Sequence, residues 1–369
     1  RKWLPPLNLK AAQPLCLGPG NFEISRKKNT ALMKLDPSLR SLVLRATSAI
    51  DVGDASLIQS LWSGYGKILR VPLTFDVVDP TNPASVIVKH VSPPCEQQDS
   101  PGNSHPRGWN TDRSHQRKVR SYEVEATWYR EFSDRCDPTC RVPAGLLVES
   151  IEGNWGFVLE DLDASGFASR KSHLDRDGVF VVLAWLANFH ATFLGEPLSG
   201  LWPVGTYWHL ATRHDEYQVM QPGKLKEAAA AIDDRLNACR FQTAVHGDAK
   251  VANFCFSVDG TRTAAVDFQY VGRGCGMKDV AYFLSSCVSE VECERNESVY
   301  LDFYFQALRQ SLASRNSTID GDALEAEWRA MYPFAWADFT RFLLGWCPGH
   351  HKLNRYSRRI TEQVLAECI

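Results

Sequence analysis

The sequence lacks an apolar run long enough to cross a membrane. Its most apolar stretch, VFVVLAWLANFHATFL at 179–194, is interrupted by Asn188 and His190. A membrane-spanning helix needs about 20 consecutive, mostly apolar residues, so this stretch predicts a buried core helix and no membrane partner is expected. No internal repeat is visible.

An excess of charge of one sign is also absent. Lys and Arg number 41 and Asp and Glu number 43, which gives a formal net charge of -2. Nucleic acids and anionic membranes attract strongly basic surfaces, so neither is an expected partner. No obligatory protein partner is evident, and the expected partner is a small molecule. The 369 residues suffice for one large or two ordinary domains.

The eleven cysteines include no C-x-x-C pair, so the usual signature of a zinc site or of a thioredoxin-like motif is missing. Cys136 and Cys140 frame a turn with a proline. We therefore expect reduced, mostly buried thiols and a cytoplasmic location. Residues 1–34 are basic, with Glu23 as the only acid; organelle targeting by a trimmed segment is the alternative to a basic surface tail.

Strand patterns come first along the chain and long helical patterns follow. Residues 66–78 and 85–91 alternate like strands, 145–162 predicts two strands around a Gly-Asn turn, and 117–136 has helical spacing. Residues 36–62 predict one or two amphipathic helices, the second capped by Asp54. Further helices are predicted at 175–194, 222–239, 276–289, 296–314 and 322–346, with an Asp-Gly hairpin at 253–268.

These patterns predict an α+β protein with a small antiparallel β-sheet N-lobe and a larger, mainly helical C-lobe. We expect residues 1–44 to form an N-terminal extension, 45–160 the N-lobe and 161–369 the C-lobe. The Pro- and Ser-rich residues 92–116 predict a long loop whose role the sequence does not define. A cleft between two such lobes is a natural place for a ligand.

Phosphoryl transfer from ATP requires a limited set of parts, and the N-lobe offers candidates for them. A tight turn that lets the backbone approach the phosphates favours glycine, and SGYGK at 63–67 supplies Gly64 and Gly66 around Tyr65. Lys89, at the end of the strand run VIVK, is placed to reach the phosphates. Taken singly, each feature has an ordinary alternative, a commonplace turn or a surface lysine.

The lysine needs a carboxylate to hold it, and the linker between the lobes should contact the adenine. Glu125, on the predicted helix 117–136, is the expected partner of Lys89, with Glu123 as the runner-up; either could instead lie on a solvated helix face. In FVLEDL at 157–162, the carbonyl of Glu160 and the amide of Leu162 are the expected contacts to the adenine edge.

The stretch AVHGDAKVANF at 244–254 contains the candidate catalytic loop, although an ordinary turn between strands is the alternative. Asp248 would accept the proton of the attacking hydroxyl, and Lys250 would neutralise charge on the γ-phosphoryl group. Asn253 would bind Mg²⁺ through its amide oxygen. The D-x-K-x-x-N spacing also occurs in many protein kinases. His246 is expected to order the loop by hydrogen bonding.

A second acid completes the set. Asp267, in AAVDFQ, follows an apolar strand and is the expected second Mg²⁺ ligand, since hard cations prefer oxygen ligands; a cap or turn acid is the alternative. The order of these parts along the chain, rather than any one of them, indicates an enzyme that uses ATP and Mg²⁺.

The chain resembles the kinase-like phosphotransferases, a group that includes aminoglycoside phosphotransferases, choline kinases and ecdysteroid kinases. Within that group it is most similar to the ecdysteroid-kinase-like branch. The resemblance covers roughly residues 50–350. The segments that carry it are VLEDLDASGF (158–167), LAWLANFHA (183–191), HGDAKVANF (246–254) and VDFQYVGRGCGMKDVAYFL (266–284).

The resemblance implies a bilobal protein-kinase-like fold, Mg²⁺-ATP as the donor and a hydroxyl of a small molecule as the acceptor. By position it implies that Asp248 is the catalytic base, that Asn253 and Asp267 bind metal, and that Asp279 is a structural acid tying the metal loop to the helical lobe. The chain departs from the pattern in two places. A full G-x-G-x-x-G is absent, and AKVAN stands where ecdysteroid kinases commonly have an LWxNN-like run.

The acceptor is expected at the aromatic-rich segment 332–356, where Trp336, Asp338 and His350 are candidate pocket residues. Core packing is the alternative, because aromatics at helical spacing are often core residues. Acids are few here, which favours a hydrophobic or sterol-like metabolite. A choline- or aminoglycoside-type phosphotransferase and a non-catalytic nucleotide-binding pseudokinase are the alternatives. A protein kinase is disfavoured because no A-P-E segment follows Asp267.

Overall fold

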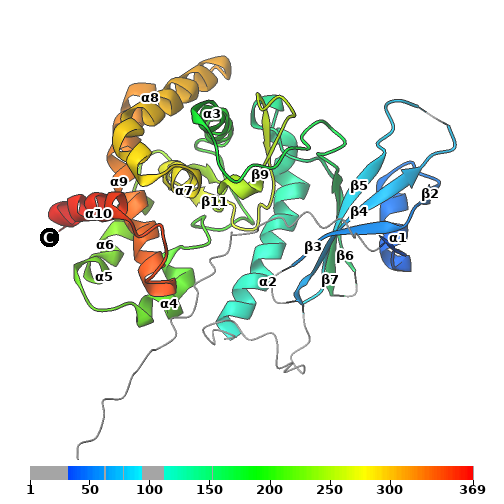
Figure 1. Ribbon diagram of the computed structural model, residues 1–369, viewed down its shortest axis with the longest axis horizontal. Helices are drawn as coiled ribbons and strands as arrows, with labels where there is room; N and C mark the ends of the chain where they lie inside the picture. Colours follow the sequence, from blue (N-terminus) through cyan, green and yellow to red (C-terminus); the bar gives the residue numbers. More distant parts are fainter. Residues whose placement is uncertain (1–31, 62–63, 78, 94–111, 152, 369) are drawn as a thin grey trace, which may run out of the picture.

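An antiparallel sheet forms the first part of the chain and a group of helices the second (Figure 1). The computed structural model describes residues 32–61, 64–77, 79–93, 112–151 and 153–368. The expected α+β class, with a sheet-containing N-terminal lobe and a mainly helical C-terminal lobe, is confirmed. No helix formed by these residues is long and apolar enough to span a membrane.

The N-terminal lobe is built on one sheet with the strand order β1-β3-β4-β5-β7-β6, in which β2 also pairs with β4 and each pairing is antiparallel. The elements of this lobe are β1 (Leu32–Met33), α1 (Pro37–Ala46), β2 (Asp51–Val52), β3 (Ala55–Ser60), β4 (Gly66–Thr74), β5 (Ser85–Val91), α2 (Asp112–Thr127), a π-helical turn (Trp128–Phe132), 3-10 turns (Ser133–Arg135 and Pro138–Cys140), β6 (Gly145–Ile151) and β7 (Asn154–Glu160).

Alternation along β5 gives the sheet two different faces. Val86 and Val88 pack with α1 in one apolar cluster, whereas Lys89 and Val91 point to the opposite face, where α2 lies. Successive side chains of a strand point to opposite sides, so the run VIVK places one lysine among apolar positions on the side toward the helical lobe. Figure 1 shows α2 standing between the sheet and the helices.

The expectation for residues 36–62 is half right. α1 begins after Asp36, whose carboxylate accepts from Ser38 N, and Pro37 occupies its first turn. The second helix is wrong: residues 55–60 form β3, which pairs with β4, and Asp54 caps no helix. Ala55 and Leu57 share one buried face, a period of two that becomes visible only once β4 lies alongside.

α1 belongs to the sheet lobe rather than to a separate extension. Its buried residues Leu39, Leu42 and Val43 pack on the sheet, so the boundary expected at 44/45 falls inside this helix. The other residues of the expected extension, 1–31, lie outside the described residues, as does most of the loop expected at 92–116.

The helical lobe contains the helices expected at 175–194, 276–289, 296–314 and 322–346, and 222–239 forms two short helices. Its elements are α3 (Arg176–Thr192), a 3-10 turn (Leu210–Arg213), α4 (His214–Val219), α5 (Lys224–Glu227), α6 (Ala229–Asn237), β8 (Thr243–Val245), a 3-10 turn (Val251–Asn253), β9 (Phe254–Phe256), β10 (Thr263–Ala265), β11 (Gly272–Gly274), α7 (Met277–Cys287), α8 (Glu290–Ser314), α9 (Gly321–Trp346) and α10 (Arg355–Cys368).

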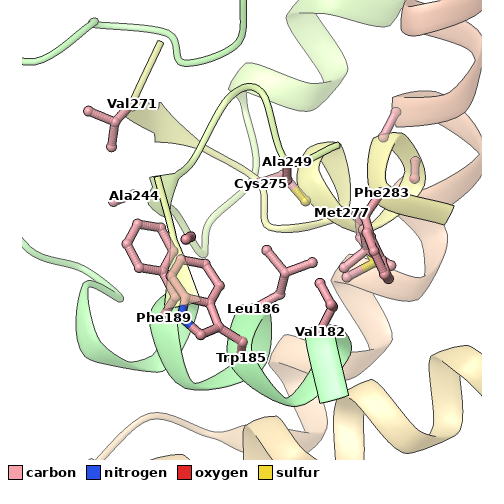
Figure 2. Packing of buried hydrophobic residues seen from close by; sticks show 14 of the residues in the cluster. Val182, Trp185, Leu186, Phe189, Ala244, Ala249, Val271, Cys275, Met277 and Phe283 are labelled. Atoms are coloured by element: carbon pink, nitrogen blue, oxygen red, sulfur yellow. The ribbon is translucent and has the colours of Figure 1, made fainter. Parts of the chain in front are cut away.

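α3 is the apolar support of the segment that carries the candidate catalytic residues. Its buried residues Trp185 and Leu186 belong to the same core cluster as Ala244 and Ala249, which flank the start of that segment. Figure 2 shows these side chains gathered between α3 and the strands of the helical lobe. The run 179–194 is therefore a buried core helix, as predicted, and it packs beneath the segment that carries the candidate catalytic residues.

Gly66, at the start of β4, has a backbone conformation that no other residue would adopt without strain. Its φ is 135°, and a Cβ atom there would lie 2.0 Å from His90 O. Gly153 also has a positive φ, 80°, but a Cβ there would meet nothing within 4 Å. An alanine at Gly66 would therefore meet both a steric clash and backbone strain, whereas an alanine at Gly153 would meet backbone strain alone.

We expect Gly66→Ala to lower the free energy of unfolding by about 2 kcal/mol or more, because strain and the clash with backbone add. Gly153→Ala should cost about 1 kcal/mol, the strain alone. Urea denaturation of both variants measures the difference. Equal losses of stability would show that the β4 and β5 backbones do not approach as described.

Candidate active site

A buried carboxylate on α7 holds the start of the segment 246–253. Asp279, which is 0% exposed, accepts hydrogen bonds from His246 N at 2.5 Å and Gly247 N at 2.9 Å. His190 Nε2 on α3 lies 3.2 Å from the same carboxylate. The resemblance implied that Asp279 is a structural acid that ties the metal loop to the helical lobe. Its contacts are to the start of the segment that ends at the candidate metal ligand Asn253.

His246 links this segment to the second acid. Its Nδ1 accepts from Asp248 N at 3.2 Å, so its Nε2 carries the proton and donates to Val266 O at 3.1 Å. Val266 directly precedes Asp267, and Val266 N donates to Asn253 O at 3.0 Å. The expected ordering role of His246 is therefore a bridge between the two loops that carry the candidate acids.

The Asp248 carboxylate, only 6% exposed, is surrounded by donors. Tyr282 OH donates to Oδ1 at 3.1 Å, and Lys250 Nζ and Asn253 Nδ2 donate to Oδ2 at 2.8 and 3.0 Å. The arrangement keeps Asp248 in one orientation as an acceptor.

Lys250 is the cation nearest to this carboxylate. Burial acts to lower the pKa of Lys250, but the neighbouring carboxylates Asp248 and Asp267 outweigh burial and raise that pKa above its usual value. Lys250 is therefore a permanent positive charge between the two candidate acids.

Asn253 and Asp267 fit a Mg²⁺ ion. The amide nitrogen of Asn253 is used by Asp248, through its carboxylate and its carbonyl oxygen, which leaves the amide oxygen to face away from Asp248. Asp267 Oδ1 is shielded yet accepts no hydrogen bond from the residues that the structure describes. A shielded carboxylate oxygen that accepts no hydrogen bond has the chemistry of a cation ligand.

Asp267 has further features of a strained functional residue. Its φ is 71°, in the left-handed region, and its side chain remains 36% exposed. Burial would raise the pKa of Asp267, but Lys89, Lys250 and Lys118 lower it below its usual range.

The described residues contain no group of three His, Cys, Asp or Glu suited to a metal. Mg²⁺ commonly takes one or two protein ligands and completes its shell with water and phosphate.

Lys89 and Glu125 form the expected pair. Lys89 Nζ lies 2.8 Å from Glu125 Oε1 and 2.6 Å from Oε2, and both side chains are buried. Burial raises the pKa of Glu125 although the ammonium of Lys89 acts in the opposite direction. Glu123, the runner-up, is exposed and pairs with Arg120. Lys89 Nζ also lies 3.7 Å from Asp267 Oδ1, which brings the two lobes together at this point.

Gly64 and Gly66 lie directly before and at the start of β4, as expected, but the residues that precede the turn form β3 rather than the expected helix. Leu61 N donates to Gly66 O at 2.8 Å, and Gly64 has a φ of 75°. Tyr65 is buried, and its hydroxyl lies 2.6 Å from His115 Nδ1 on α2. The turn therefore rests on the same helix that carries Glu125.

The linker at 160–163 is fixed by side chains of the sheet lobe. Glu160 ends β7 and its carboxylate pairs with Arg141, while Leu162 is buried and its carbonyl accepts from Phe167 N at 2.8 Å. Between them, Asp161 accepts from Arg70 Nε at 2.6 Å and Ser85 Oγ at 2.7 Å. The backbone contacts expected for Glu160 and Leu162 stay a prediction.

The candidate acceptor residues lie in different surroundings from those expected. Trp336 packs on Tyr356 of α10, with ring centroids 4.8 Å apart, and belongs to the main core. Asp338 is fully buried and bound to Arg341 at 2.7 Å. Burial lowers the pKa of His350 to about 4, and its Nδ1 accepts from Lys352 N. For Trp336 and Asp338 this geometry favours the core alternative.

Both carboxylate oxygens of Asp338 already accept hydrogen bonds from core residues. Arg341 contacts its Oδ1 twice, and Trp208 Nε1 donates to its Oδ2 at 3.1 Å. The arginine lies one helical turn further along α9, which is the signal in the sequence that could have identified a structural pair.

Three residues beside the acids were missed. Tyr282 follows Asp279 by three residues and so lies on the same face of α7. This spacing could have identified Tyr282 from the sequence. Lys118 donates to Gln269 Oε1 at 2.7 Å and so joins α2 to the Asp267 loop. Lys352 packs over the ring of Tyr282 at 4.9 Å, and no spacing rule connects it with the acids.

Residues 209–317 match the model of the ecdysteroid kinase-like family. The expected resemblance is thus confirmed over this part of the chain, which contains Asp248, Asn253, Asp267 and Asp279. A search of the curated proteins finds no significant match.

Several solved structures are distantly similar to the chain. A microcompartment-associated aminopropanol kinase is 16% identical, with 90% of this chain and 94% of that chain covered and a TM-score of 0.46. The GDP complex of aminoglycoside 2'-phosphotransferase-IIIa is 11% identical, with 89% and 98% covered and a TM-score of 0.45. A choline/ethanolamine kinase family protein from Mesorhizobium loti is 14% identical, with 86% and 87% covered and a TM-score of 0.38. No residue's role follows from likeness at this level.

The buried Lys89–Glu125 pair should show strong coupling in a double-mutant cycle. Removing one partner leaves an unpaired buried charge, so Lys89→Met and Glu125→Leu should each cost about 3–5 kcal/mol of unfolding free energy. The double variant should cost clearly less than the sum. Denaturant unfolding of the four proteins gives the coupling energy.

The exposed pair Arg120–Glu123, on the same helix, is the matched control. Its coupling should stay below about 1 kcal/mol. Additive losses for Lys89 and Glu125 would mean that the two side chains are not paired in solution.

Proposed function

We propose that the protein is a small-molecule kinase that uses ATP and Mg²⁺ to phosphorylate a hydroxyl group of a metabolite. The observation that supports this most is that Lys89 lies 3.7 Å from Asp267, while Lys250 pairs with Asp248 and also interacts with Asp267. These residues come from three separate segments, in the order expected for phosphoryl transfer. The family match over residues 209–317 supports the same class.

Residues of the sheet lobe would bind the ATP. The Lys89 ammonium is fixed by Glu125 and directed toward Asp267, so it is placed to contact oxygens of the nucleotide phosphates. The turn at Gly64–Gly66 lies at the start of β4, the strand that pairs with the Lys89 strand β5, and would cover the phosphates with backbone. The linker around Glu160 and Leu162 would receive the adenine.

Asn253 and Asp267 would hold the metal ion, whose positive charge offsets the negative charge of the phosphates. Asp248 would bind the acceptor hydroxyl and accept its proton as the oxygen attacks. The donors Tyr282, Lys250 and Asn253 orient this carboxylate, so its main contribution is to aim the hydroxyl. Lys250 would stabilise negative charge on the transferred group.

The charges near Asp248 disfavour a cationic acceptor. Acids close to the aromatic segment are already paired, Glu216 with Arg213 and Asp338 with Arg341. Lys352 and Lys250 add positive charge beside Asp248. A polycationic aminoglycoside or a choline would meet like charges, which supports an acceptor with an apolar body.

Asp248→Asn should lower turnover by about 10³-fold or more, because an amide does not accept the hydroxyl proton. Transfer of label from γ-labelled ATP to a metabolite extract measures turnover, and mass spectrometry identifies the product. ADP binding should persist in the variant, because the nucleotide contacts proposed above do not involve Asp248.

Asp259→Asn is the matched control, since Asp259 lies at the exposed tip of the β9–β10 hairpin and bonds only to Ser257 and Thr261 among the described residues. It should leave turnover unchanged. Full turnover in Asp248→Asn would refute the proposed role of this residue.

A further inference from the structure

A second lysine lies beside the candidate catalytic acid, on a segment distant in sequence. Lys352 is in the connection between α9 and α10, and its Nζ lies 4.9 Å from the centroid of the Tyr282 ring and 5.4 Å from that of Phe339. The hydroxyl of Tyr282 donates to Asp248 Oδ1. Lys352 is therefore separated from Asp248 by one aromatic side chain.

The backbone around Lys352 is held in place. Lys352 N donates to His350 Nδ1 at 3.1 Å, His350 N donates to Cys347 O at 2.9 Å, and Leu353 N donates to His350 O at 2.9 Å. Because burial keeps the pKa of His350 low, this imidazole stays neutral and remains an acceptor near neutral pH. The turn thus presents Lys352 in one direction.

Within the described part of the chain, Lys352 has no counter-ion of the kind that Lys89 and Lys250 possess. Lys89 pairs with Glu125 and Lys250 with Asp248, but no carboxylate oxygen within the described part of the chain lies within 4.0 Å of Lys352 Nζ. Its one hydrogen bond there is to Ser285 Oγ, at 3.4 Å. A shielded ammonium without an anion costs free energy, and burial lowers the pKa of Lys352 to about 8.

The surroundings of Lys352 are aromatic. Tyr282 and Phe339 belong to an apolar cluster that also contains Tyr207, Trp208 and Phe342. The cluster joins the 205–216 segment, α7 and α9. Lys352 as a residue is partly buried rather than fully enclosed, which is compatible with contact to a ligand. An ammonium among aromatic rings is stabilised by their faces, but no net charge is cancelled.

We propose that Lys352 is a specificity-determining residue that binds an acidic group of the acceptor, a carboxylate, sulfate or phosphate ester, while Asp248 receives the hydroxyl. The acceptor class is then a hydroxylated molecule with an apolar body and one acid group. The aromatic cluster would contact the apolar body. This inference rests on the proposed kinase function and makes it more specific.

The test divides a metabolite extract by charge before the reaction. Acidic, neutral and basic fractions are each incubated with γ-labelled ATP, Mg²⁺ and the full-length protein. Labelled product should come from the acidic fraction. Product mainly from the neutral or basic fraction would overturn the assignment of Lys352. No labelled product from any fraction would contradict the proposed function itself.

Substitution then identifies the residue. Lys352→Met keeps an unbranched side chain over Tyr282 and Phe339 but removes the charge, so the KM for the acidic fraction should rise about 10- to 100-fold, the worth of one charged hydrogen bond. The KM for ATP should stay unchanged, and Lys352→Arg should recover most of the loss. An unchanged KM for the acidic fraction in Lys352→Met would overturn the proposal.

Lys226→Met is the matched control. Lys226 also lies over an aromatic ring, 5.4 Å from the centroid of Tyr217, and it bonds to backbone carbonyls of Gln218 and Met220 rather than to site residues. It should change neither KM. An equal rise of KM in Lys226→Met and Lys352→Met would indicate a general loss of packing and would contradict a role specific to Lys352.

Discussion

The buried carboxylate of Asp279 is the constraint on which the candidate site depends. It accepts from the backbone amides of His246 and Gly247 and contacts His190, whose other ring nitrogen lies 2.7 Å from Tyr304 OH on α8. Without it, two amides would be buried in the helical lobe with no acceptor, which native proteins avoid. Three helices, α3, α7 and α8, thereby fix the backbone immediately before Asp248, and the apolar floor of α3 supports the same segment.

From this anchor, hydrogen bonds and stacking extend to the second acid and then to the sheet lobe. His246 donates to Val266 O, and Phe268 stacks on Trp128 with ring centroids 4.4 Å apart. The loop at 266–269 is thus held on both sides of Asp267, whose positive φ is over-determined by these contacts. Lys118 and Gln269 attach the loop to α2, the helix that holds Lys89 through Glu125. The two lobes meet where Lys89 approaches Asp267.

The parts of the site that depend on local spacing could be predicted from the sequence, and the parts that depend on tertiary contacts could not. Asp248 and Asn253 lie in one short loop, and Lys89 and Glu125 lie on a strand and helix whose patterns are plain. Residues 55–60 were expected to be helical because their strand character comes from pairing with β4. Whether Trp336 and Asp338 face a pocket or the core depends on α10 and on Arg341. Lys352 was missed because it meets Tyr282 only through the folding of the helical lobe.

The central claim is that Asn253 and Asp267 hold a divalent cation together with a nucleotide, beside the acid that receives the hydroxyl. The most direct measurement is the affinity of ADP by titration calorimetry, with and without Mg²⁺, for the unmodified protein and for Asp267→Asn. Since Asp267 would hold Mg²⁺ when the nucleotide is bound, the account predicts that Mg²⁺ tightens ADP binding about tenfold or more, and that Asp267→Asn loses this gain but keeps metal-free binding. An equal Mg²⁺ effect in both proteins, or no binding of ADP by the unmodified protein, would contradict the account.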